Sequence, residues 1–240
     1  MEDEAALRAK TATLARMLNL QGTIGMFGHV SIRVPGTTRM LISPGASTEK
    51  ATVRPEQIFI FDLDGTIIEH PGGLIPLEWR IHTRIHRDRP DAMCIAHLHA
   101  PAARVLGIAG RELVPVFLHG SFLHGGVPVW NNPRLVVNEE QAADLSRALG
   151  DKIAAQMRGH GCVVVGETAE ATFFGCTFLE ENARIQLEAD IVGKAIALSP
   201  EEAADCAKGT YDPRLFGLLW DYYARKVELP LAAAPARPPS

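Results

Sequence analysis

Two histidines separated by a single residue, His97 and His99, are the clearest chemical signal in the sequence. They stand at the end of the apolar run 92–97, which predicts a strand. On an extended strand, side chains two positions apart lie on the same face, roughly 6–7 Å apart. Both imidazoles could therefore bind one divalent ion, while Leu98 points the other way into the core. Two unrelated histidines at a strand end are the alternative interpretation.

A third histidine, His160, lies between two glycines just before the apolar run 162–165. Glycines on both sides allow a sharp turn and a close approach of the backbone. Three neutral imidazoles would leave a dication with open positions for water or substrate, as a catalytic site requires. A turn histidine exposed to water is the alternative.

Glu78 is the candidate acid or base. It follows the loop 72–76 at the start of a helix predicted to run from Pro76 to about Arg87, where a carboxylate suits the helix dipole. That loop could present Glu78 to a cleft. Many helices carry such a carboxylate without any function, and His82, one turn later on the same face, is most simply a packing residue.

Two glycine-containing junctions and two arginines are candidates for substrate binding. The junctions 28–31 and 43–47 could donate backbone N–H groups to an anionic group, and an arginine could bind a carboxylate through two hydrogen bonds. Ordinary turns and unpaired surface arginines are the alternatives. The residues in question are His29, Ser31, Arg33, Ser43, Gly45 and Arg80.

Both strands and helices position these residues. Strands cluster in runs rather than alternating strictly with helices, so we expect one α/β domain with a central, mostly antiparallel sheet. The pattern predicts helices at 4–20, 76–87, from Pro101, at 139–149 behind an Asn138 cap, and from Thr168, and strands at 29–34, 40–43, 57–63, 66–68, 92–97, in short pieces within 113–129, and at 163–165.

The composition is that of an ordinary globular protein. The 240 residues carry a net charge of −4 and are 47% hydrophobic, which is ample for a core and gives no electrostatic sign of a nucleic-acid or membrane partner. Cys94 and Cys162 lie in apolar runs and are expected to be buried, reduced thiols. The acidic N-terminus lacks the apolar stretch of a signal peptide and no run could span a bilayer, so the cytoplasm is the expected location.

Several spaced motifs together resemble the class II aldolase/adducin domain family, over roughly residues 5–195. No single motif is specific, but their order along the chain matches the family. They are Gly28–Arg33, Leu41–Gly45, Asp62–Gly65, Pro76–Glu78, Arg89–Asp91, His97–His99, His160–Gly161, Val163–Gly166 and Leu179–Ala183.

The resemblance implies a three-layer α/β/α fold around an antiparallel sheet. We expect residues 1–228 to form one domain that ends in a helical extension, and the Ala- and Pro-rich composition of 229–240 predicts a disordered tail. The resemblance implies a homotetramer with active sites between subunits. It also implies one divalent metal ion per subunit (Zn, Mn, Fe or Co), held by His97, His99 and His160, with Glu78 as the base. In such a site the metal stabilises the enolate left when a carbon–carbon bond breaks.

Two departures from the family's sugar-phosphate aldolases change the expected substrate. Those enzymes have Gly-Asn where this chain has Gly28-His29, and Ser-Ser where it has Pro76-Leu77. Both changes remove polar donors from the phosphate site. The variant pattern looks like the decarboxylase branch, whose members remove CO2 from hydroxylated aromatic or pyridine dicarboxylic acids.

We therefore expect a metal-dependent lyase, most simply a decarboxylase of a hydroxylated aromatic or heteroaromatic acid. The alternatives are an aldolase acting on a non-phosphorylated hydroxy-carbonyl compound, a non-haem iron oxygenase, and an adducin-like interaction domain without catalysis. The presence of all three candidate ligands and Glu78 argues against the last of these.

The reaction also requires a residue that donates a proton to the carbanion left by decarboxylation. The aldolases' tyrosine has no obvious equivalent, because all three tyrosines of this chain are C-terminal. Histidine has a pKa suited to proton delivery near neutrality. His119 or His124 is the candidate, and His124, followed by two glycines, could reach a neighbouring subunit's metal. Structural loop histidines are the alternative.

Overall fold

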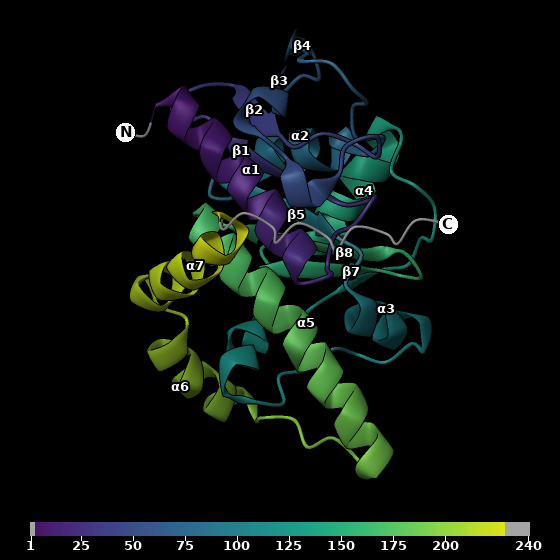
Figure 1. The fold of residues 1–240 in the computed structure, drawn as a ribbon. Helices are drawn as coiled ribbons and strands as arrows, with labels where there is room; N and C mark the ends of the chain where they lie inside the picture. The colour runs from purple at the N-terminus through teal and green to yellow at the C-terminus, as the bar shows by residue number, and fades with distance from the viewer. Residues whose placement is uncertain (1–2, 229–240) are drawn as a thin grey trace, which may run out of the picture.

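A single eight-stranded sheet organises residues 3–228, the part of the chain that the computed structural model describes (Figure 1). The strand order is β4-β3-β2-β1-β5-β8-β7-β6, and every pairing is antiparallel except that of β6 with β7. The strands are β1 (His29–Arg33), β2 (Arg39–Ile42), β3 (Phe59–Asp62), β4 (Ile67–Glu69), β5 (Cys94–Leu98), β6 (Val129–Trp130), β7 (Ala154–Met157) and β8 (Gly161–Gly166).

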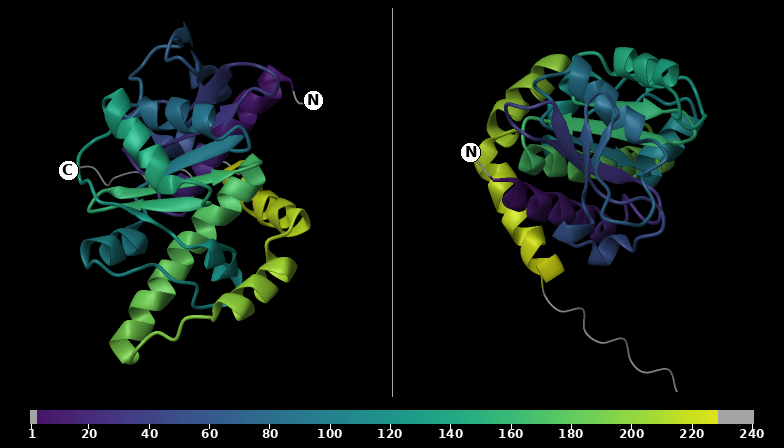
Figure 2. Two further views of the ribbon diagram at one scale, coloured as in Figure 1. Left: turned by 180° about the vertical axis from the view of Figure 1, so that it is seen from behind. Right: turned by 90° about the horizontal axis from the view of Figure 1, so that it is seen from above.

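Helices cover both faces of this sheet (Figures 1 and 2). One face packs against α1 (Glu4–Leu20), α3 (Pro101–Ile108) and α5 (Ala169–Val192), with α7 (Pro213–Glu228) outside α1 and α5. The other face packs against α2 (Trp79–Asp88) and α4 (Glu139–Leu149). The expected three-layer α/β/α fold with a mostly antiparallel sheet is therefore confirmed.

Alternation along the strands assigns side chains to the two layers. On β5, Cys94, Ala96 and Leu98 belong to the core under α1 and α5, whereas Ile95 belongs to the core under α2 and α4. His97 follows Ile95 by two residues and so lies on the α2 face, as the period of two in an extended strand requires. Leu98 is fully buried on the opposite side, as predicted.

Helix starts follow the sequence closely where a capping side chain is present. Asn138 accepts the backbone N–H of Gln141 at the start of α4, and Thr168 accepts that of Ala171 at the start of α5. The helix predicted from Pro76 instead begins at Trp79, with Glu78 at its N-cap and a turn from Pro76 before it. At this N-cap position the Glu78 side chain makes no capping hydrogen bond, so its carboxylate is free to contact other parts of the structure.

The prediction of short strands within 113–129 is largely wrong. The segment forms the 3₁₀ helix η3 (Leu118–Gly125), and only β6 starts at its end; two further 3₁₀ turns, η1 (Lys50–Thr52) and η2 (Pro55–Gln57), lie earlier in the chain. Backbone groups of Val114 and Val116 pair with the side-chain amides of Asn182 and Gln186 on α5 rather than with a neighbouring strand. Strand β7, which the pattern did not predict, lies between β8 and β6.

The C-terminal part of the described chain forms α6 (Pro200–Thr210) and α7. Phe216 of α7 is buried, and Tyr223 packs edge-on against Phe173 of α5. The tail predicted at 229–240 lies outside the described residues. Within residues 3–228, no helix has the length and apolar character needed to cross a membrane.

The predicted state of the core cysteines is confirmed, since Cys94 and Cys162 are fully buried free thiols. Burial raises the pKa of both to about 12. Both thiols are therefore un-ionised near neutral pH.

Asn182→Leu should lower the free energy of unfolding by about 1–3 kcal/mol, because the fully buried Asn182 side chain makes two hydrogen bonds with the part-buried 114–116 segment, each worth about 0.5–1.5 kcal/mol. Urea denaturation followed by circular dichroism measures the change. Glu188→Gln, which removes an exposed ion pair with Arg184 on the same helix, is the control and should change stability by less than about 0.5 kcal/mol. Equal urea midpoints for the two variants would contradict the stabilising role assigned to Asn182.

Candidate metal centre

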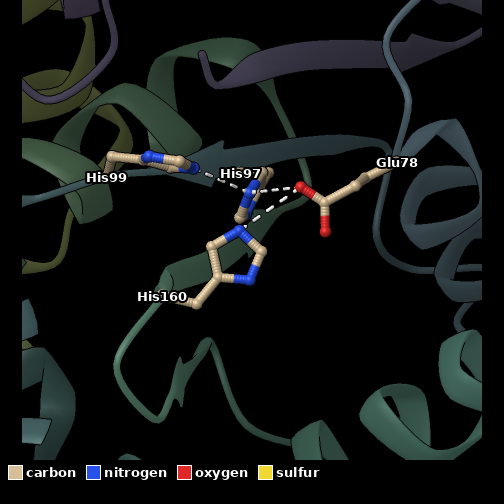
Figure 3. A group of neighbouring side chains, drawn as sticks. All are labelled: Glu78, His97, His99 and His160. Carbon is tan, nitrogen blue, oxygen red and sulfur yellow. Dashed lines mark hydrogen bonds and ion pairs between the residues drawn. The ribbon is translucent and has the colours of Figure 1, made fainter. Parts of the chain in front are cut away.

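Four side chains converge at the end of β5, and they come from three separate parts of the chain (Figure 3). Glu78, His97, His99 and His160 each offer one ligand atom, and these atoms all lie within 4.8 Å of one another. Three of them are buried and His99 is partly buried. Strand β5 supplies His97 and leads into His99, the β7–β8 turn supplies His160, and the N-cap of α2 supplies Glu78.

The ring of His97 is held in a fixed orientation. Its backbone pairs with His29 of β1 on one side and Val163 of β8 on the other, so it is central in the sheet. Its Nδ1 lies 3.2 Å from the Cys162 carbonyl oxygen. A carbonyl only accepts, so Nδ1 carries the proton and Nε2 keeps its lone pair. That nitrogen points at the centre of the cluster, as an imidazole ligand must.

The glycines beside His160 have the role that the sequence predicted. Gly159 has φ +71°, and a Cβ on Gly161 would overlap the Leu98 carbonyl oxygen. Side chains at either position would therefore displace the turn from the end of β5. The turn is closed by a hydrogen bond from the His160 N–H to the Met157 carbonyl, 3.0 Å long.

Both ring nitrogens of His160 are buried, and neither makes a hydrogen bond in the described structure; Nε2 faces the Glu78 carboxylate at 3.3 Å. The Nε2 atoms of His97 and His99 face each other at 3.3 Å. Buried polar atoms without partners are costly, and the contact between His97 and His99 is favourable only if one of the two Nε2 atoms carries a proton. A divalent cation could be bound by the lone pairs of all three imidazoles, so the residues present fit a bound metal ion.

Glu78 contributes the one negative charge of the cluster. Its Oε2 lies 3.4 Å from His97 Nε2 and 3.3 Å from His160 Nε2, and its Oε1 accepts the Val136 N–H at 2.8 Å. Burial opposes ionisation, but the imidazoles of His160 and His97 outweigh it when their Nε2 atoms carry protons, and they then hold the pKa of Glu78 below its ordinary value. Three imidazoles and a carboxylate suit Zn, Mn, Fe or Co, and do not choose among them.

A cavity of about 570 Å³ opens onto this cluster. Glu78, His99 and His160 form its polar end, and most of the remaining wall is apolar. Several of these apolar side chains are at least half exposed, Leu77 by 69% and Met26 by 63%. The apolar wall consists of Met26, Phe27, Ala46, Leu74, Ile75, Pro76, Leu77, Pro133 and Leu135.

Of the residues predicted to bind substrate, His29 and Gly45 line this cavity. The other four do not line it within the single chain. The Ser43 hydroxyl accepts the Val30 N–H, Arg33 donates to the His86 carbonyl, and the Arg80 guanidinium lies 4.2 Å from the centre of the Trp79 ring. Ser31 is buried beneath α2. A substrate role for these four residues stays a prediction.

The two candidate proton donors lie elsewhere on η3. His119 stacks on Phe178 with ring centroids 4.7 Å apart. His124 lines a smaller pocket that also contains Leu198. Neither lines the cavity at the cluster within one chain, so a catalytic role requires the neighbouring subunit that the sequence resemblance implies, and it stays a prediction.

Arg104 is a cavity residue that the sequence analysis missed. It lies on the first turns of α3, five residues after His99, and with Glu78 it is one of the two charged side chains on the wall. No ion pair or hydrogen bond joins its guanidinium to the residues the structure describes. The signal available in the sequence was its position just after a proline helix start that follows the strand with the candidate metal ligands.

Comparison with known proteins gives one family. The model of the class II aldolase and adducin N-terminal domain matches residues 9–187. Two curated relatives are 3,4-dihydroxyphthalate decarboxylases. The protein of Rhodococcus jostii is 30% identical, with 77% of this chain and 81% of the relative aligned, and that of Arthrobacter keyseri is 31% identical, with 82% and 84% aligned.

Solved structures agree on the fold. An aldolase II superfamily protein from Pseudomonas syringae has a TM-score of 0.84 at 24% identity, covering 95% of this chain and 94% of that one. An L-fuculose-1-phosphate aldolase from Thermus thermophilus is 30% identical with a TM-score of 0.68, covering 81% of this chain and all of that one.

Replacing any one of His97, His99 or His160 with alanine should remove stoichiometric metal while the fold survives. Catalytic ions are typically held by three protein ligands, so losing one should weaken binding by more than the roughly 10–100-fold typical of an outer contact. Elemental analysis after dialysis gives metal per chain, and circular dichroism reports the fold. The exposed His70, changed to alanine, is the matched control. Full occupancy in His160→Ala would remove His160 from the site.

Proposed function

The chain belongs to the class II aldolase and adducin N-terminal domain family, and from that premise we propose that it is a metal-dependent lyase that decarboxylates a hydroxylated aromatic or heteroaromatic acid. The observation that carries the proposal is the cavity itself. Its wall is apolar, its polar end is the histidine–glutamate cluster, and its one cation is Arg104. These features suit a flat apolar ring that carries hydroxyl and carboxylate groups.

Each part of the wall has a role in this reaction. Arg104 would bind a carboxylate of the substrate through charge-assisted hydrogen bonds. The apolar side chains would pack against the ring and exclude water, which strengthens every electrostatic interaction in the cavity. Ionised Glu78, with Oε2 facing the cluster, would accept a hydrogen bond or a proton from a substrate hydroxyl.

His97, His99 and His160, with Glu78 beside them, would hold the divalent ion. When bound, the ion supplies positive charge against the negative charge that develops on the substrate as its carbon–carbon bond breaks. The homotetramer and the contribution of His119 or His124 from a neighbouring subunit belong to the same proposal.

The same observation argues against a sugar phosphate. A phosphate group would meet Pro76 and Leu77 on the wall, and neither has a side-chain donor. An aldolase acting on a non-phosphorylated hydroxy-carbonyl compound is the second candidate, favoured by the likeness to the Thermus aldolase. A non-catalytic interaction domain, the adducin-like alternative, would give no role to the buried ring of His160, whose nitrogens make no hydrogen bond in the described structure. Stoichiometric metal in the purified protein would argue against that alternative.

The metal-loaded protein should release CO2 from at least one member of a panel of hydroxylated benzoates, phthalates and pyridine carboxylates. The panel should include 3,4-dihydroxyphthalate, the compound in the names of the two decarboxylases. A coupled CO2 assay and the ultraviolet spectrum follow the reaction. Fuculose and ribulose phosphates should not be cleaved. Efficient cleavage of either would replace the decarboxylase proposal with the aldolase one.

Arg104→Ala should raise KM for the active dicarboxylate about 10–100-fold, the usual worth of a charge-assisted hydrogen bond, with a smaller effect on kcat. Steady-state kinetics on metal-replete protein measure both constants. Arg111→Ala is the control, since Arg111 pairs with Asp190 outside the cavity. An unchanged KM in Arg104→Ala would assign carboxylate binding to another group.

A further inference from the structure

Three histidines and a serine form a second polar cluster between the sheet and α2. His29 Nδ1 lies 2.6 Å from His82 Nε2, and His82 Nδ1 lies 2.7 Å from the Ser31 hydroxyl. The same hydroxyl lies 2.9 Å from His86 Nε2, and His86 Nδ1 lies 2.8 Å from the Ala92 carbonyl oxygen. These contacts form one unbranched chain of hydrogen bonds, which we name the histidine chain.

The local structure explains this arrangement. His29 and Ser31 are two apart on β1 and point to the same face, the one that α2 covers. His82 and His86 are four apart on α2 and share the helix face turned to the sheet. Ser31, His82 and His86 are fully buried and His29 is 5% exposed. Such a buried row of polar groups is stable only if every member is paired.

The Ala92 end of the histidine chain sets its direction. A carbonyl only accepts, so His86 Nδ1 carries the proton and, in neutral His86, Nε2 accepts from the Ser31 hydroxyl. Ser31 then accepts from Nδ1–H of His82, which leaves His82 Nε2 to accept from Nδ1–H of His29. Each neutral imidazole has one donor and one acceptor, so a single carbonyl fixes all three tautomers.

The neutral state of His86 is supported by its surroundings. Burial lowers the pKa of His86 to about 3, against the opposing hydrogen bond to Ala92, and the Arg33 guanidinium lowers it further. A protonated His86 would donate at both ends and reverse the direction of the histidine chain. The end of the histidine chain away from His29 contacts only the Ala92 carbonyl and is fully buried. The histidine chain therefore orients His29 and does not conduct protons to solvent.

We propose that the histidine chain holds His29 in the tautomer whose Nε2 is an acceptor, and that this atom binds a hydroxyl of the substrate. His29 lines the cavity, and its ring centre lies 5.1 Å from that of His97. Nδ1 is taken by His82, so Nε2 is the atom left for a ligand. The inference rests on the proposed function and makes it more specific: the site selects a ring hydroxyl next to the metal centre.

Glu78 and His29 would then each bind one hydroxyl group of the substrate. Glu78 faces the cluster from the α2 side, and His29 stands beside His97 on β1. A site that hydrogen-bonds a substrate hydroxyl rejects the analogue that lacks it, because its own buried polar group is left unpaired. In this interpretation, His29 determines specificity, and Ser31, His82 and His86 are positioning residues.

The test is the protonation of the histidine nitrogens, observed by ¹⁵N NMR on zinc-loaded protein with labelled histidine. Wild type should show His29 protonated at Nδ1 and bare at Nε2. Adding 3,4-dihydroxyphthalate should shift the Nε2 resonance, and phthalate, which lacks the hydroxyls, should not shift it. Protonation of His29 at Nε2, or an Nε2 resonance that responds to neither or to both compounds, would overturn the inference.

Ser31→Ala breaks the histidine chain at its centre and should let His29 populate both tautomers. The binding preference for dihydroxyphthalate over phthalate should then fall about 10-fold, the upper range for one hydrogen bond, and Ser31→Thr should restore it. Ser146→Ala is the matched control, a buried serine that bonds Asp88 on the same side of the sheet. If Ser31→Ala does not fold, the ¹⁵N spectrum of the wild-type protein still tests the proposed His29 tautomer.

The two proposals fail separately. A protein that releases CO2 from a hydroxylated acid while His29 is protonated at Nε2 would keep the proposed function and lose this inference. A protein with the expected tautomer and the expected Nε2 response, but no CO2 release from any compound of the panel, would keep the inference and lose the decarboxylase.

Discussion

The antiparallel pairing of β1 with β5 is the constraint on which the site depends. Its register sets His29 opposite His97 and, by alternation, Ser31 opposite Ile95 on the face that α2 covers. A slip of one residue would move these side chains to the opposite face, among the apolar residues under α1 and α5. The hydrophobic core that fixes the register therefore also fixes which nitrogens meet at the metal centre.

Local signals in the sequence were sufficient for the parts of the site that are local in the chain. His97 and His99 converge because a strand has a period of two, and Gly159 and Gly161 could be interpreted because few other residues fit a turn against Leu98. Asn138 and Thr168 cap their helices within three residues. In each case the functional residue and the feature that fixes its geometry lie within a few residues of each other in the sequence.

The rest depended on contacts between distant segments. The 112–117 segment has a strand-like composition, but its backbone partners are amides on α5, from 66 to 74 residues further along the chain. His82 was interpreted as a packing residue, and its true partners lie on β1, more than 50 residues earlier. Arg104 belongs to the cavity only because α3 follows β5 at the site. Periodicity cannot show which faces meet, so these relations needed the fold.

The hydrogen bond between Glu78 Oε1 and the Val136 N–H links the metal centre to the cavity wall. Val136 is fully buried, and its neighbour Leu135 is part of that wall. If the Glu78 carboxylate rotated away from the cluster, the Val136 N–H would be left buried without an acceptor, at a cost of about 1–3 kcal/mol. Reorientation of the carboxylate and displacement of the 133–136 segment are therefore mechanically coupled, so a ligand that displaces Leu135 would also shift the Glu78 carboxylate at the candidate metal centre.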